Sequence, residues 1–237
     1  MGLNNEPFIS NEEIEQSTIN LLEDFKQFYK KPFGPSIPIR ELLCDFLKID
    51  YCGENLIAQT HDPSTLAQFL VLADGQMLIC VEESLWPEDG CDLAKLGRFN
   101  FTLAHEIMHF ILHKHVLFDH LEETPLLFGE KRQIVLCRSS QKDRREYQAD
   151  KGAGYLLMPT AFILKEWEKK FGVNAGPVNV YDEIKRKSEL EGRDIKSIRD
   201  SVSLEFAEKF RVSPQAIQIR LRDMNLLELE PGQPSLF

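Results

Sequence analysis

The run from Phe101 to His113, Phe-Thr-Leu-Ala-His-Glu-Ile-Met-His-Phe-Ile-Leu-His, constrains the fold of this chain more than any other feature. Apolar residues surround its histidines and its glutamate on every side, which predicts a buried helix rather than a solvated one. Residues four apart share one face of a helix, so His105 and His109 can bind the same tetrahedral ion. Metal coordination would also offset the cost of burying these polar side chains. The run therefore predicts half of a metal site.

Glu106 lies next to the first histidine, where its carboxylate can reach the edge of the site without binding the ion. Zinc lowers the pKa of a bound water from about 16 to about 7, and a nearby carboxylate can pass that water's proton to a leaving amine. The arrangement predicts peptide-bond hydrolysis with Glu106 as the general base. The alternative is a core helix whose histidines are only hydrogen-bonded.

Two residues compete for the third metal ligand. His115 has the spacing of a third histidine after His-Glu-x-x-His, but Leu112 stands where a glycine would let the chain turn back. Glu146 and Asp150 lie four apart on a second predicted helix. Glu146 is the favoured ligand, and Asp150 is expected to accept the outer N–H of one histidine. A charged, solvated helix face remains the alternative for this pair.

These segments resemble the ImmA/IrrE metallopeptidases. Three blocks carry the resemblance, within about residues 76 to 227. They are Arg98-Phe-Asn-Phe-Thr-Leu-Ala-His-Glu-Ile-Met-His109, then Glu146-x-x-Ala-Asp150 leading into Tyr155-Leu-Leu-Met-Pro159, and Leu204-x-x-Ala-x-x-Phe-x-Val-Ser-x-x-Ala-x-x-x-Arg-Leu221. Met108 departs from the family, which usually has glycine there, and this affects local packing only.

The resemblance implies a gluzincin-like site with His105, His109 and Glu146 on the metal and Glu106 as general base. It implies Zn²⁺ as the cofactor, with Mn²⁺ as the other ion to consider. It also implies a partner, because similar proteins cleave or disable a helix-turn-helix (XRE-type) transcriptional repressor, often after DNA damage or in mobile elements. The expected function is thus a site-specific antirepressor peptidase in a stress or mobile-element response.

Composition favours a cytoplasmic protein. Hydrophobic residues make up 43% of the chain, charged residues 28%, and the net charge is 28 minus 38, or -10. The five cysteines include no Cys-x-x-Cys pair, and their odd number argues against a complete disulfide framework. The first residues lack a basic start and an apolar core, and no apolar run approaches membrane-spanning length. We therefore expect no membrane partner.

The remaining chain predicts an α+β fold. We expect a helix over Asn11–Tyr29, a Pro-rich break, a helix over Ile39–Leu47, and a hairpin of strands at 66–72 and 76–81 around Asp74-Gly75. The second strand is predicted either as an edge beside the active site, open to substrate as an added strand, or as an ordinary sheet strand. A small antiparallel-containing sheet should pack on the His-Glu-x-x-His helix in a zincin-like core.

The sequence divides into four expected regions. They are an N-terminal helix and Pro-rich break (1–37), the metallopeptidase core (38–175), a C-terminal helix-turn-helix-like helical subdomain (176–228) and a flexible tail (229–237). In the subdomain, Ser213 is the expected cap of a helix that begins at Pro214.

DNA binding by the C-terminal helices should be weak. From Arg193 to Asp223, seven basic residues face five acidic ones, and DNA affinity comes largely from neutralising phosphates. We favour a structural or partner-docking role there. The tail, Gln233-Pro-Ser-Leu-Phe237, resembles the Gln-x-x-Leu-Phe peptides that dock on bacterial sliding clamps, although such tails are more often simply disordered.

Two function classes therefore remain. One is a zinc-dependent endopeptidase, and the other is a non-catalytic regulator with a structural metal that binds a repressor or DNA. Three ligands with an adjacent base favour the endopeptidase, because structural zinc sites usually have four protein ligands.

Overall fold

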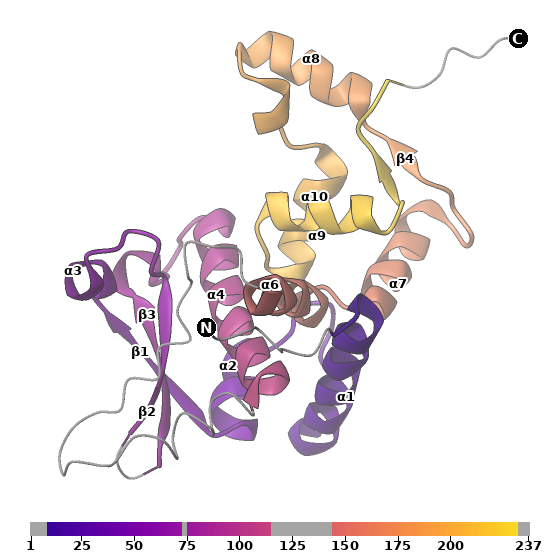
Figure 1. The fold of residues 1–237 in the computed structure, drawn as a ribbon. Helices are drawn as coiled ribbons and strands as arrows, with labels where there is room; N and C mark the ends of the chain where they lie inside the picture. The colour runs from indigo at the N-terminus through magenta and orange to yellow at the C-terminus, as the bar shows by residue number, and fades with distance from the viewer. Residues whose placement is uncertain (1–8, 73–74, 115–143, 232–237) are drawn as a thin grey trace, which may run out of the picture.

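Helix α4 (Leu93–Leu112) lies between a sheet on one side and helix α6 (Arg144–Leu157) on the other (Figure 1). It begins after Asp92, whose side chain accepts a hydrogen bond from the backbone N–H of Lys95 at 2.7 Å. Residues 102–110 of this helix are buried on every side, as the apolar pattern predicted. The computed structural model describes residues 9–72, 75–114 and 144–231.

The sheet has three strands in the order β1-β3-β2. Strands β2 (Ala67–Val71) and β3 (Met77–Glu82) form the antiparallel hairpin that the sequence predicted. Strand β1 (Ile49–Glu54) pairs parallel with the other side of β3. Of the two alternatives for the strand at 76–81, the edge strand was therefore wrong and the ordinary sheet strand is confirmed, because β1 pairs with β3 and leaves it in the centre.

The two faces of this sheet have different partners. Side chains alternate between the faces of a strand. Ile79 and Val81 of β3 join the main hydrophobic core together with apolar residues of α4, whereas Cys80 joins a small separate cluster with Leu56 and Leu70. Helix α3 (Leu56–Thr60) contacts this second face. The sheet thus has an inner face toward α4 and an outer face toward α3.

Small residues of α6 allow it to lie close to α4. Ala149 and Ala153 are fully buried, and a Cβ added at Gly152 would lie 2.7 Å from the side chain of Met108. The distance between packed helices depends on the side chains at the contact. Met108, the departure from the family pattern, therefore occupies space that Gly152 leaves free.

Of the N-terminal elements, helix α1 packs on the far side of α6. Helix α1 (Asn11–Tyr29) has the bounds that the sequence predicted, and a capping box of Ser10 and Glu13 fixes its start. The helix expected over Ile39–Leu47 consists of α2 (Ile39–Glu41) and a π turn (Leu42–Phe46). In Figure 1 the layers follow one another as sheet, α4, α6 and α1.

The C-terminal helices lie above these layers in Figure 1. Ser213 caps the last helix and Pro214 is its first residue, as predicted. A parallel pair of short strands joins the segment after α7 to the end of the described chain. The elements are α7 (Thr160–Phe171), β4 (Val178–Asn179), α8 (Tyr181–Glu191), α9 (Ser201–Phe210), α10 (Pro214–Asp223) and β5 (Leu227–Glu228).

One main hydrophobic cluster includes residues from α1, the sheet, α4, α6 and the C-terminal helices. The four proposed regions and the helix-turn-helix-like nature of the subdomain stay predictions. Within the ranges that the structure describes, no helix combines the length and apolarity that crossing a membrane requires.

Candidate metal centre

Helix α4 holds the three polar residues of the His-Glu-x-x-His pattern inside the protein. His105 and His109 are each 1% exposed, and Glu106 is 3% exposed. Burying such groups is costly unless they are hydrogen-bonded or bound to an ion. Their surroundings should therefore contain specific partners.

Helix α6 supplies the partners that the sequence predicted. The two carboxylate oxygens of Glu146 lie 3.3 Å from Nε2 of His105 and 3.3 Å from Nε2 of His109. On the other side of the ring, Nδ1 of His105 donates to Asp150 at 2.9 Å. The structure thus places Glu146 toward the two Nε2 atoms and Asp150 behind one histidine.

His109 has an outer partner that the sequence analysis missed. Its Nδ1 lies 3.1 Å from Nδ1 of His113, and Nε2 of His113 lies 2.8 Å from the side-chain oxygen of Gln148. Because that oxygen accepts, His113 carries its proton on Nε2, and its Nδ1 then accepts from His109. The signal was present, since His113 follows His109 by one further step of four along the helix.

These outer hydrogen bonds assign the protons of both predicted ligands. Each of His105 and His109 donates through Nδ1, so the Nε2 atom of each ring carries a lone pair whenever that ring is neutral. The two Nε2 atoms lie only 2.9 Å apart and share the carboxylate of Glu146. Two ring nitrogens and a carboxylate this close together are stabilised by a cation among them, either a proton or a metal ion.

The protein without metal holds a proton there. Burial disfavours a charged His105, but hydrogen bonds to Asp150 and Glu146 raise its pKa to about 9. Burial raises the pKa of Glu146, but hydrogen bonds from His105 and His109 lower it to about 2. A metal ion must therefore displace a proton from His105 at neutral pH.

The residues present fit a metal ion. The donor atoms of His105, His109 and Glu146 lie within 4.8 Å of one another. Two imidazoles and one carboxylate are a common ligand set of catalytic zinc, and histidines that bind metal usually donate their second N–H to an acceptor. His105 and His109 both do so. The competing ligand, His115, lies outside the described residues.

Two histidines four apart on a helix, with a carboxylate from a second element, are the donor set of metallopeptidases of the His-Glu-x-x-His kind. Residues 92–175 match the family model of the IrrE N-terminal-like domain, Peptidase_M78. The match begins at the cap of α4 and includes α6 and α7, and it confirms the resemblance to the ImmA/IrrE family metallopeptidases. The third resembling block, Leu204–Leu221, lies beyond it. A comparison with curated proteins gave no match.

Asp150→Asn should weaken metal binding by about 10- to 100-fold, the usual cost of losing an outer partner of a metal ligand. Asparagine has nearly the same shape but cannot place a negative charge 2.9 Å from Nδ1 of His105. Competition with a chelator for zinc measures the change. Asp223→Asn is the control, because Asp223 also makes one 2.9 Å contact and is similarly exposed, at 43% against 58%. Equal affinity of both variants would contradict the role of Asp150.

The metal-free protein should lose stability as the pH rises from about 6.5 through 9. The pKa of His105 is raised from 6.5 to about 9 on folding, so its contribution is complete below 6.5 and disappears above 9. The pKa of Glu146 is lowered, so its contribution is lost only as the pH falls from 4.5 through about 2. Urea unfolding with a chelator present measures this dependence. A His105→Gln variant should lack the decline above pH 6.5, and an equally steep decline in that variant would assign it to other groups.

Proposed function

We propose that this protein is a zinc-dependent endopeptidase. In this proposal His105, His109 and Glu146 hold Zn²⁺, with Mn²⁺ as the alternative ion, and Glu106 is the general base. The observation that carries the proposal is the convergence of three donor atoms within 4.8 Å beside a buried carboxylate. A fourth coordination position left to solvent or substrate is what a catalytic zinc site has and a structural one lacks.

In this proposal, each residue of the site has its own role in peptide hydrolysis. A bound metal ion would supply Lewis acidity, polarising a peptide carbonyl and lowering the pKa of water. Glu106 accepts the proton of the attacking water and donates it to the leaving amine. Asp150 and the pair of His113 and Gln148 fix the tautomers of the two histidines, so that both Nε2 atoms stay available to the ion.

We further propose a helix-turn-helix (XRE-type) repressor as the substrate, in keeping with the family resemblance. A cavity of about 750 Å³ supports the docking of a protein partner. It is lined by residues of α4, α6 and α10 and includes Asp150, the outer partner of His105. The exposed side chains of Tyr147 and Ile219 lie at this cavity. A bound segment would thus lie close to the metal centre.

The charges of the C-terminal helices support a docking role over DNA binding. Arg220 of α10 is buried, stacks on the ring of Tyr155 and donates to Thr160. Lys209 of α9 contacts Glu166 and Glu205. Side chains engaged in this way neutralise few phosphates. The tail at 232–237 lies outside the described residues, so its docking on a sliding clamp stays a prediction, as does a cytoplasmic location.

The experiment that tests the proposal compares new protein N-termini in cells that express the wild type or Glu106→Gln, with and without DNA damage. One new terminus within a helix-turn-helix repressor, absent from the variant, would support both the activity and the substrate. A terminus in another protein would support the peptidase and overturn the repressor. Identical termini in both strains, together with unchanged antirepressor activity of the variant, would favour a non-catalytic regulator instead.

A further inference from the structure

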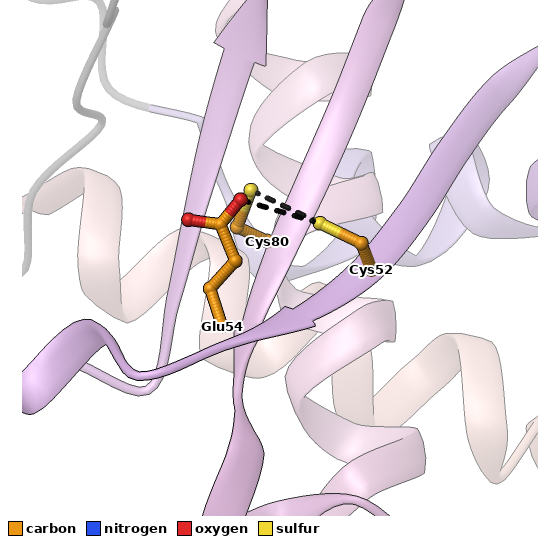
Figure 2. Close-up of side chains that lie close together, drawn as sticks. All are labelled: Cys52, Glu54 and Cys80. Atoms are coloured by element: carbon orange, nitrogen blue, oxygen red, sulfur yellow. Dashed lines mark hydrogen bonds between the residues drawn. The ribbon is translucent and has the colours of Figure 1, made fainter.

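The outer face of the sheet carries two thiols and a carboxylate that have no role in the centre described above. Cys52 of β1 and Cys80 of β3 are directly paired in the parallel register of these strands. Glu54 follows on the same face of β1, two residues after Cys52. Figure 2 shows the three side chains pointing toward one another from the two neighbouring strands.

The distances suit a common ligand. The two sulfur atoms lie 3.3 Å apart, and Oε1 of Glu54 lies 3.7 Å from Sγ of Cys52. All three donor atoms fall within 4.8 Å of one another. Two sulfurs on one tetrahedral zinc, each with a bond of about 2.3 Å, are about 3.7 Å apart. Adjustments of a few tenths of an ångström would bring the sulfurs to that separation.

The carboxylate is held in place by the next element of the chain. Gln59 of α3 donates to Oε2 of Glu54 at 3.1 Å, while Oε1 faces Cys52. Outer hydrogen bonds that orient a carboxylate are a regular feature of metal sites. Gln59 of helix α3 therefore orients Glu54, just as Asp150 of helix α6 orients His105.

Apolar packing explains only part of this cluster. A buried cysteine behaves as a small hydrophobic residue, which accounts for Cys80 beside Leu56 and Leu70. It does not account for a carboxylate oriented toward the paired thiol.

We propose that Cys52, Glu54 and Cys80 form a second metal site, on the face of the sheet opposite α4. Two thiolates and one carboxylate select a thiophilic divalent cation such as Zn²⁺ over Mg²⁺ or Ca²⁺. The ion ties edge strand β1 to central strand β3. Because it binds the folded sheet, it stabilises that pairing according to its concentration.

Cobalt distinguishes this site from the first one in the intact protein. Only thiolate ligands give a sulfur-to-cobalt charge-transfer band in the near ultraviolet, and the donors of the α4–α6 centre include no sulfur. Reduced full-length protein, titrated with Co²⁺ without oxygen, should develop this band to the intensity of one bound cobalt per chain, which is complete once both centres are filled at two equivalents. Cys80→Ser and Cys52→Ser should lose it, whereas Glu54→Gln should keep a weaker band. The band should then disappear when Zn²⁺ is added.

Three further cysteines, Cys44, Cys91 and Cys137, provide matched controls. The band should persist in each of their serine variants. No band in the wild type would overturn the proposal, and so would a band that survives Cys52→Ser and Cys80→Ser. A mass decrease of two hydrogens on purification, with no band after reduction, would overturn it in favour of a disulfide. Serine is nearly isosteric with cysteine, and thermal unfolding confirms that each variant is folded.

Discussion

Glu106→Gln should bind metal as the wild type does and hydrolyse its substrate about 10²- to 10⁴-fold more slowly, the usual contribution of a general base. The amide has nearly the same shape as the carboxylate but cannot accept the proton of the attacking water. The proposed ligands His105, His109 and Glu146 are untouched, so the metal content should not change. Elemental analysis measures the metal, and the rate at which the new N-terminus of the substrate appears measures the hydrolysis.

The stability of this variant separates a chemical loss from a folding defect. Glu106 is almost fully buried, and a neutral amide avoids the desolvation cost of a carboxylate. The thermal midpoint should therefore equal or exceed that of the wild type. Glu168→Gln makes the same chemical change at an exposed position of α7 and should leave the rate unchanged. A Glu106→Gln enzyme with full activity would exclude Glu106 as the base.

Gly97→Ala should destabilise the protein by about 1–3 kcal/mol, the range seen when an atom is forced into a well-packed site. A Cβ at position 97 of α4 would lie 2.1 Å from the backbone nitrogen of Ser213 and 2.5 Å from the carbonyl carbon of Val212. Both atoms belong to the turn between α9 and α10, so no side-chain rotation can relieve the clash. Asn100 donates to the backbone oxygen of Arg211 in the same turn at 3.0 Å.

Intrinsic helix propensity favours alanine over glycine by about 1 kcal/mol, so on that ground alone Gly97→Ala would stabilise the protein. The clash with the turn gives the expected change in stability the opposite sign. Gly154→Ala is the matched control within α6, because its Cβ would meet only Met158, at 3.9 Å. That variant should be neutral or slightly more stable. Urea unfolding of both variants measures the difference. Equal stability of Gly97→Ala and Gly154→Ala would show that α4 does not contact the α9–α10 turn as closely as described.

Local sequence patterns predicted the part of the site that depends on helical spacing. Two histidines and a glutamate on one apolar helix, and two acids four apart on another, favoured Glu146 over His115 as the residue that meets the two histidines. The orientation of Glu146 toward both Nε2 atoms needed the structure, because it depends on how α6 packs against α4. His113 and Gln148 were not predicted as part of the site, because neither belongs to the motif. Their contact forms only when the two helices pack together.

The sheet shows where sequence reasoning fails. Strand β1, Ile-Asp-Tyr-Cys-Gly-Glu, contains a glycine and two acids and has few of the features that mark a strand. Its partner β3 lies beyond α3 and β2, so the pairing is non-local. Without β1, the sequence did not decide whether β3 is an edge strand or an ordinary sheet strand, and Cys52 had no visible relation to Cys80. The packing of Met108 over Gly152 is hidden in the same way, since it joins two distant segments.

The ribosome also makes the proposed ligands of the metal centre at different times. A ribosome that has completed α4 has made both histidines, but Glu146 and Asp150 belong to α6, which is translated later. A nascent chain ending between the two helices therefore has an incomplete ligand set. The complete set exists only once α6 has emerged and docked on α4. An activity that needs Glu146 as a ligand would therefore be absent from a chain that ends between the two helices.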